Sequence, residues 1–257
     1  MSVLRVSDIQ KAYGGIRAVD SVSFQVERGQ MVALIGPNGA GKSTCFNILN
    51  GQIRADSGVV EFDGERISDL KPREIWKRGV GRTFQIPEIY VSMTVCENVQ
   101  MVLLSKYERL SNCFIRASRA YRDEAMTLLA RVGMEDYAEQ PAGMLAYGDV
   151  KRLELVLGLT NDPKLLLMDE PTAGMAVDER NQLMKLIAGL VKERNLAVLF
   201  TEHSMDVVFA YADHIEVLSR GKIIASGAPS EVRDDKLVQE IYLGSAAFLN
   251  VRERVTA

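Results

Sequence analysis

The spacing of apolar and polar residues divides the chain into three parts. Up to about residue 85, short stretches rich in apolar residues lie between glycine-containing turns, a pattern that predicts strands. These stretches are Leu4–Asp8, Val22–Val26 and Val59–Phe62. Met31–Ile35 is a continuous apolar run, typical of a buried strand. The first part is therefore expected to be rich in β structure.

The middle part, from about Thr94 to Gln140, has a helical pattern. Apolar residues recur there at the spacing of one helix face. The two sets are Val95, Val99, Val102 and Leu103, and Ala125, Leu128, Leu129 and Val132. Pro141 and Gly143 end this block.

From Tyr147 onward, predicted helices alternate with short apolar strands. The strands are expected at Lys164–Met168, Ala197–Phe200 and His214–Leu218. Such alternation favours a mainly parallel sheet with helices on both faces. The sequence then predicts a last, antiparallel strand at Gly221–Gly227 and helices at Ser230–Asp235 and Lys236–Tyr242.

Composition and charge narrow the class of protein. The chain has 257 residues, enough for one large α/β domain. A formal net charge of −3 gives no general attraction to nucleic acid or anionic lipid. No apolar run approaches the roughly 20 residues that span a bilayer, and the N-terminus lacks a signal peptide's pattern. If the protein works at a membrane, we expect it to do so from the cytosolic side and through a partner protein.

The segment Gly36–Thr44 carries the most specific motif. It fits G-x-x-x-x-G-K-[ST], the phosphate-binding loop of nucleoside triphosphatases, and it follows a predicted strand and opens a predicted helix. Backbone N–H groups of such a loop hold phosphate. Lys42 is expected to reach the β- and γ-phosphates, and the Ser43 hydroxyl to bind Mg²⁺. The expected nucleotide-binding residues of this phosphate loop are Gly36, Asn38, Gly39, Ala40, Gly41, Lys42, Ser43 and Thr44.

A second motif places two carboxylates at the end of a buried strand. Leu165–Met168 is followed by Asp169 and Glu170, at the sheet edge where parallel strands present ligands. Asp169 is expected to hold Mg²⁺ through its hydration shell. Glu170 is expected to act as the general base for the attacking water. A solvated acidic loop is the alternative, which the phosphate loop disfavours.

A third motif, Leu145–Arg152, lies shortly before the acidic strand. With it, the chain from Leu4 to Gly244 resembles the nucleotide-binding subunit of ABC transporters. The resemblance implies one ABC ATPase domain over 1–257. It would be an α/β fold, a P-loop NTPase with a RecA-like core, an N-terminal antiparallel β subdomain and an inserted helical subdomain. The core and β subdomain would comprise about 1–85 and 160–244, the helical subdomain about 86–159, and a tail 245–257.

The resemblance assigns further roles. Tyr13 matches the aromatic residue that stacks on adenine, and Gln85 the glutamine that senses Mg²⁺ and links the core to the helical subdomain. His203 matches the switch histidine at the γ-phosphate. Backbone groups near Tyr147 and Gly148 would face the ATP of a second subunit. His214 matches no motif and is interpreted as structural.

Four positions depart from the family pattern. Tyr147 and Asp149 stand where the signature usually has its second glycine and its glutamine. Ala146 replaces the signature serine that donates to the γ-phosphate across the dimer, which removes one donor worth roughly 1.5–3 kcal/mol. Ala176 replaces an aspartate that many relatives carry after the acidic strand. ATP binding is therefore a firmer expectation than fast turnover.

Details such as Thr83–Pro87, Met93–Asn98 and Thr201–Phe209 resemble the Liv-type importers of branched-chain amino acids. This implies a second ABC ATPase subunit, integral membrane permease subunits and, indirectly, a periplasmic solute-binding protein, with no nucleic acid. The chain would sit peripherally on the cytoplasmic face of the inner membrane. Apolar residues near Gln85 would dock the permease or cap the local core; these are Ile86, Ile89, Tyr90, Val91 and Met93.

Other function classes stay open at this level. Urea importers and the lipopolysaccharide export ATPase have similar sequences. A soluble ABC ATPase of DNA repair or the ribosome is disfavoured because the insertion is short, shows no sustained heptads and belongs to a single cassette. An ATP-binding regulator without turnover is disfavoured by the presence of both Glu170 and His203.

Overall fold

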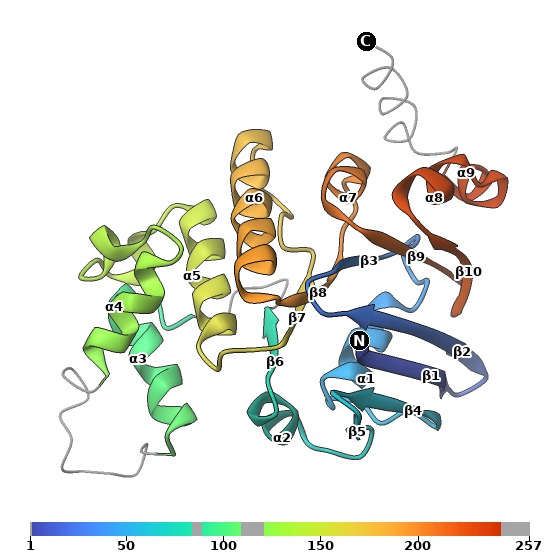
Figure 1. Ribbon diagram of the computed structural model, residues 1–257, viewed down its shortest axis with the longest axis horizontal. Coiled ribbons are helices and arrows are strands. Elements are labelled where there is room, and N and C mark those ends of the chain that lie inside the picture. The colour runs from blue at the N-terminus through green and yellow to red at the C-terminus, as the bar shows by residue number, and fades with distance from the viewer. Residues whose placement is uncertain (1, 84–88, 109–120, 243–257) are drawn as a thin grey trace.

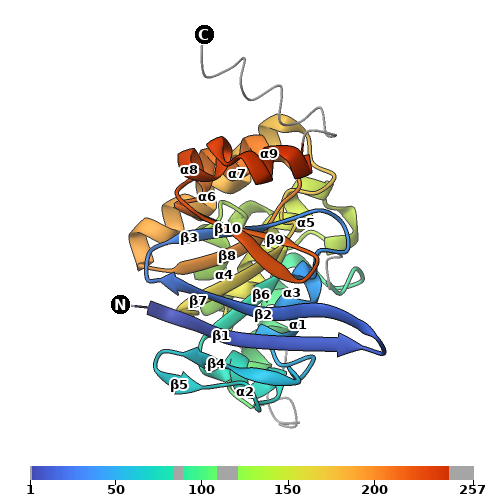
Figure 2. The same cartoon turned by 90° about the vertical axis from the view of Figure 1, so that its right-hand side faces the viewer.

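The computed structural model describes residues 2–83, 89–108 and 121–242. It contains two sheets and the helices that pack on them (Figure 1). The expected tail at 245–257 lies outside the described residues. In Figure 2 the antiparallel sheet lies below the larger sheet, and α6–α9 lie above it.

The larger sheet has six strands in the order β10-β9-β3-β8-β7-β6. Every neighbouring pair is parallel except β9 and β10. The strands are β3 (Met31–Ile35), β6 (Val80–Thr83), β7 (Leu165–Asp169), β8 (Ala197–Thr201), β9 (His214–Ser219) and β10 (Lys222–Gly227). The parallel strands β3, β8 and β7 therefore end at a common edge, where ligands bind in open α/β sheets.

The second sheet is antiparallel and has the order β2-β1-β4-β5. Its strands are β1 (Ser2–Tyr13), β2 (Ile16–Glu27), β4 (Ser57–Phe62) and β5 (Glu65–Arg66). Helix α1 (Lys42–Leu49) packs with β1, β2 and one face of the six-stranded sheet in a single apolar cluster. The face toward this cluster carries Val32 and Leu34, whereas Ala33 and Ile35 point to the other face, as the two-residue period of a strand requires.

The remaining helices cover the other face and extend from it, except α2, whose Ile75 packs in the same cluster as α1. They are α2 (Pro72–Lys77), α3 (Val95–Lys106), α4 (Arg122–Ala130), α5 (Tyr147–Leu159), α6 (Val177–Arg194), α7 (Met205–Tyr211), α8 (Pro229–Asp234) and α9 (Lys236–Tyr242), with short 3₁₀ turns at Glu135–Tyr137 and Ala142–Met144. Residues of α3, α4 and α5 share one buried cluster with β3, β7 and β8. The helical part and the sheet thus share a core. The subdomain boundaries given above stay a prediction.

The α/β fold class with its antiparallel β part is confirmed, and so are the predicted strands and the last two helices. Helix α2 and strands β5 and β6 were not predicted from the sequence. Strand β6 has only four residues, and Gly81 and Arg82 interrupt its apolar character. It forms because its backbone pairs with β7 at the sheet edge, a contact that local pattern does not reveal.

One buried carboxyl group lies between the two sheets. Glu216 on β9 is 4% exposed, and its Oε2 has no hydrogen-bond partner in the described structure. Its Oε1 lies 3.3 Å from Nε2 of His214. Arg5, Glu27 and His214 line the same cavity, of about 450 Å³. Burial raises the pKa of Glu216 from 4.5 to about 7, and a hydrogen bond with Ser226 acts in the opposite direction.

We predict that this group makes the protein less stable as the pH rises. Below pH 4.5 the folded and unfolded states both hold the proton. Between the unfolded and folded pKa values the folded state binds more protons, so stability falls with rising pH and stays low above about 7. The full difference is about 3 kcal/mol at one pKa unit per 1.36 kcal/mol.

Urea unfolding of the Glu216→Gln variant tests this prediction. The variant should lose less stability than wild type between pH 5 and pH 8, and it should be the more stable protein at pH 8. Glu193→Gln, at an exposed glutamate of α6, is the control and should follow wild type. Identical pH slopes for wild type and Glu216→Gln would contradict the prediction.

Candidate functional site

The phosphate loop joins β3 to α1, and glycine is required at two of its positions. Gly41 has φ 109°, and a Cβ there would lie 2.2 Å from the carbonyl oxygen of Ala18 on β2. A Cβ on Gly36 would lie 2.1 Å from the carbonyl oxygen of Leu218 on β9. The loop is thus pressed between the two sheets, and no larger residue fits at these two points.

The loop residues have different surroundings. Asn38 and Gly39 are exposed at the tip, whereas Ala40 is buried and its N–H donates to the Pro37 carbonyl (3.1 Å). Ser43 is exposed in the first turn of α1, beside the partly buried Thr44. The loop therefore offers an accessible tip and an accessible hydroxyl.

Lys42 is the charged centre of the loop. Its side chain is buried, and Nζ donates to the carbonyls of Gly36 (2.7 Å) and Pro37 (3.2 Å). Burial lowers the pKa of Lys42, and the negative charges of Glu170 and Asp169 partly oppose that shift. The structure thus brings the phosphate loop and the acidic end of β7 into one electrostatic environment.

The acidic pair is held by Thr201, a residue that the sequence analysis did not single out. Asp169 pairs with Thr201 in the parallel β7–β8 register. The fully buried Thr201 hydroxyl donates to Oδ1 of Asp169 (2.7 Å) and accepts the N–H of Glu170 (3.0 Å). One hydroxyl therefore fixes both the Asp169 carboxylate and the backbone of the next residue.

Glu170 and His203 meet at the edge of the sheet. Oε1 of Glu170 lies 2.8 Å from Nε2 of His203, which follows β8. Glu170 has φ 49°, a left-handed conformation that a non-glycine residue adopts at a cost. Such strain is characteristic of functional sites. The backbone turn after β7 aims this carboxylate at the histidine.

Glu202 is a second group that the sequence analysis did not identify. It is 3% exposed, and its Oε1 accepts from the N–H (2.9 Å) and the hydroxyl (2.7 Å) of Thr172. Its Oε2 accepts the N–H of His203 (3.2 Å). Glu202 therefore ties the loop after Glu170 to the histidine. A single glutamate directly after an apolar strand gave no distinctive signal for this role.

The signature segment begins helix α5. Ala146 is the N-cap and offers no side-chain acceptor. The Tyr147 hydroxyl donates to the carbonyl of Ala173 (3.1 Å), in the loop that follows Glu170. A Cβ on Gly148 would come within 3.3 Å of the Glu179 carboxylate, on α6. Tyr147 and Gly148 thus lie beside the chain's own acidic loop.

One of the expected nucleotide-binding residues, Tyr13, stands apart from this centre. Tyr13 ends β1 and is half exposed, with Nζ of Lys11 5.8 Å from its ring. Strand β2, which follows the Tyr13 turn, contacts the phosphate loop through the Ala18 carbonyl. Gln85 lies outside the described residues.

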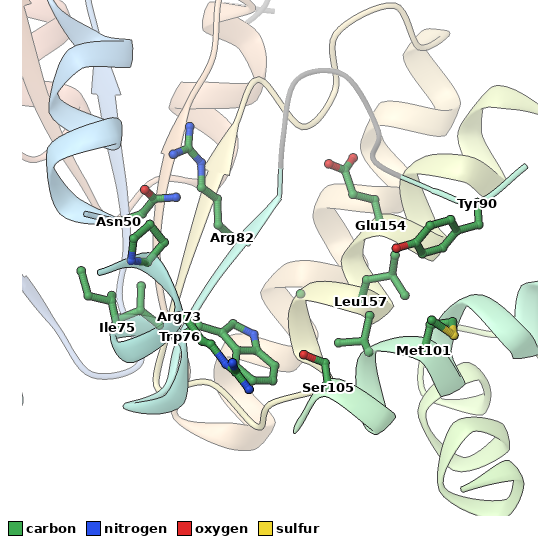
Figure 3. Close-up of a pocket in the computed structure, with 14 residues that line it drawn as sticks. Asn50, Arg73, Ile75, Trp76, Arg82, Tyr90, Met101, Ser105, Glu154 and Leu157 are labelled. Atoms are coloured by element: carbon green, nitrogen blue, oxygen red, sulfur yellow. The ribbon is translucent and has the colours of Figure 1, made fainter. Parts of the chain in front are cut away.

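A cavity of about 500 Å³ lies beside this centre, between the sheet and the helices α3 and α5 (Figure 3). Its wall includes Arg82 of β6, Trp76 of α2 and Leu157 of α5, together with Tyr90 from the loop before α3. Buried Asn98 fixes the loop at this wall, accepting the Tyr90 N–H (2.8 Å) and donating to the Tyr90 carbonyl (3.1 Å).

Together, these features define a nucleotide-binding α/β protein of the phosphate-loop type, and comparison with known proteins extends this to a family. Residues 19–173 match the family model described as "ABC transporter". Residues 222–247 match a second model, "Branched-chain amino acid ATP-binding cassette transporter". The chain belongs to the ABC transporter family, as one of its ATP-binding cassettes.

Individual proteins similar to this chain are also ATP-binding cassettes of transporters. The high-affinity branched-chain amino acid transport ATP-binding protein BraF of Pseudomonas aeruginosa is 38% identical, over 95% of this chain and 98% of its own length. The ADP conformation of the cassette MJ1267 is 33% identical with a TM-score of 0.87, over 95% of this chain and 100% of that one. The dimeric post-hydrolysis structure of MJ0796, bound to ADP and Pi, is 25% identical with a TM-score of 0.75, covering 88% and 98%.

The expected enzyme class and the expected Liv-type branch are confirmed: the chain is an ABC ATPase of a transporter. In the described part of the chain, no helix is both long enough and apolar enough to cross a membrane.

We predict that the Thr201 hydroxyl stabilises the protein through Asp169. Thr201→Val keeps the shape of the side chain but leaves the Asp169 carboxylate without that donor. Its free energy of unfolding should fall by about 1–3 kcal/mol, measured by urea denaturation. Thr201→Ser keeps the hydroxyl and should lose less. Equal losses in the two variants would contradict the prediction.

Proposed function

We propose that this cassette drives import of branched-chain amino acids by binding ATP with Mg²⁺ and hydrolysing it at Glu170. The observation that carries the proposed catalytic roles is the Glu170 carboxylate, which extends from a left-handed backbone position and is hydrogen-bonded to His203. Its negative charge also raises the pKa of Lys42. The proposed identity of the solute is supported by the second family model and by the name of BraF, both of which refer to branched-chain amino acids.

The phosphate loop would hold the phosphates of ATP. Its backbone N–H groups and the N-terminus of α1 attract anions. Lys42 would exchange its two carbonyl partners, Gly36 and Pro37, for phosphate oxygens, which suit a buried ammonium better because they carry negative charge. The exposed ring of Tyr13 offers a face on which adenine stacks.

The residues present fit a magnesium ion. Ser43 supplies an accessible hydroxyl and Asp169 a carboxylate held in place by Thr201, both hard oxygen ligands. No cluster of three His, Cys, Asp or Glu that could hold a metal occurs among the described residues. This fits Mg²⁺, which keeps several waters and takes few protein ligands. Gln85 is the third proposed ligand. When bound, Mg²⁺ would neutralise charge that develops on the phosphates.

Glu170 would accept a proton from the attacking water. His203 lies within hydrogen-bond distance of that carboxylate and would orient it toward the γ-phosphate. The Thr201 contact to the Glu170 N–H keeps the backbone of the base fixed. A carboxylate placed in this way needs no rearrangement when the water arrives.

A second ATPase subunit would complete each site. Tyr147 and Gly148 of one chain would face the ATP on the phosphate loop of the other, as in a head-to-tail dimer. Ala146 has no hydroxyl to donate across that interface. If the partner is a different ATPase with a serine at the position of Ala146, one site of the heterodimer would have a hydroxyl donor to the γ-phosphate and the other would not.

The cavity between the sheet and α3–α5 would receive a cytoplasmic helix of the permease. Tyr90, which lines this cavity, is 55% exposed, and its neighbour Val91 is 62% exposed, although apolar side chains are usually shielded. Ile89 packs against the core, Met93 is partly buried, and Ile86 lies outside the described residues. A periplasmic solute-binding protein would select the amino acid. The chain would act peripherally at the cytoplasmic face of the inner membrane.

We predict that Glu170→Gln binds ATP like wild type but hydrolyses it at least about 100-fold more slowly, the range for loss of a general base. A fluorescent ATP analogue measures binding, and phosphate release measures turnover. Uptake of labelled leucine by cells carrying the complete transporter should fall in parallel. Glu193→Gln is the control. Unchanged turnover would show that Glu170 is not the general base. If cells lacking the cassette took up leucine as fast as cells that carry it, branched-chain amino acids would not be the transported solute.

A second prediction concerns docking. Tyr90→Glu and Met93→Glu should abolish co-purification with the permease, because each places a charge against an apolar helix, while ATP binding by the isolated chain stays unchanged. Leu237→Glu, at an exposed apolar residue of α9, is the control and should assemble normally. Normal assembly of the Tyr90 and Met93 variants would place the docking site elsewhere.

A further inference from the structure

Arg82 belongs at once to the docking cavity and to the nucleotide centre. It lines the cavity on the side of the sheet, opposite Glu154 and Tyr90 (Figure 3). In the same side chain, Nη2 lies 3.9 Å from Oδ2 of Asp169. Among the described residues, no other lining residue of the cavity has an ion pair with Asp169.

Two neutral amides fix the guanidinium in this place. Nη1 donates to Oε1 of Gln52 (3.1 Å), and Nη2 donates to Oδ1 of Asn47 on α1 (3.0 Å). Neither amide neutralises the charge of Arg82. The ion pair with Asp169 is shielded from water, with side-chain exposures of 10% and 15%. The attraction is therefore stronger than that of an exposed surface pair.

The two oxygens of Asp169 have different partners. Oδ1 accepts from the neutral Thr201 hydroxyl, and Oδ2 faces the positive charge of Arg82. A cation beside a carboxylate reduces the attraction of that carboxylate for a second cation. If Asp169 holds the magnesium of the nucleotide, Arg82 opposes that binding while it stays beside Oδ2.

We propose that Arg82 is a positioning residue that couples the cavity to Asp169. This inference rests on the proposed function. With the cavity empty, the guanidinium lies against Asp169 and weakens magnesium binding. A permease segment in the cavity that offers a hydrogen-bond acceptor draws the guanidinium away from Asp169. Such an occupant shifts the equilibrium because it interacts differently with the two positions of Arg82.

The test measures Mg²⁺ binding apart from turnover. Every protein carries Glu170→Gln, so that nucleotide is not consumed, and Mg²⁺ is titrated against binding of a fluorescent ATP analogue. In the isolated chain, Arg82→Gln should lower the half-saturating Mg²⁺ concentration by about three- to tenfold, since a nearby cation is removed. Arg82→Lys should stay closer to the parent protein because it keeps the charge.

The assembled complex with the permease provides the second half of the test. There the parent protein should need less Mg²⁺ than in isolation, and the difference between it and Arg82→Gln should vanish. Gln52→Ala removes an exposed anchor of Arg82 without touching the core. It should shift the isolated chain in the same direction as Arg82→Gln, which keeps the test valid if Arg82→Gln fails to fold. Arg54→Gln is the matched control, because Arg54 contacts the Asp69 carbonyl instead.

Three outcomes would overturn the inference. These are an unchanged Mg²⁺ requirement in the Arg82→Gln and Gln52→Ala chains, a higher requirement in either, and a difference that persists unchanged in the complex. Failure of the proposed function would look different, because the parent protein would then bind the ATP analogue without any dependence on Mg²⁺ or not bind it at all.

Discussion

The parallel pairing of β7 with β8 is the contact on which the candidate site depends. It sets Asp169 opposite Thr201, and the Thr201 hydroxyl then contacts both the Asp169 carboxylate and the Glu170 N–H. The same pairing brings His203, just beyond β8, within 2.8 Å of Glu170. A shift of one residue in this register would separate the Asp169 and Glu170 carboxylates from the histidine, because each is placed by its distance from the strand end.

The cavity side of the molecule depends on the outermost pairing, β6 with β7. Strand β6 places Arg82 beside Asp169, and its residues also line the cavity under α3 and α5. The helices of that region share their buried cluster with the sheet. If a permease segment docks there, as proposed, packed side chains connect these helices to the sheet, and Arg82 is the charged group at the junction.

Much of the site was predictable from local pattern. The phosphate loop and the Asp169–Glu170 pair each follow a short apolar strand, and Met31–Ile35 is confirmed residue for residue. Strand β6 was missed because its four residues include Gly81 and Arg82. Thr201 and Glu202 were missed as site residues because a threonine or glutamate at a strand end has no distinctive pattern. Their importance lies in hydrogen bonds to residues about thirty positions earlier. His214, interpreted as structural, lies beside the buried carboxyl of Glu216, whose burial the apolar pattern of β9 did not indicate.

The sequence by itself determined the motifs: which loop has the phosphate-binding pattern, which strand end carries the carboxylates, and which family the chain resembles. These features follow from residue type and spacing within one short segment, where local backbone geometry alone sets the positions of the side chains. The tertiary structure alone decided the neighbours: Thr201 beside Asp169, Arg82 between Asp169 and the cavity, and Glu216 buried between two sheets. The order of strands in a sheet is set by packing between distant segments, so the partners across it cannot be read from any one of them.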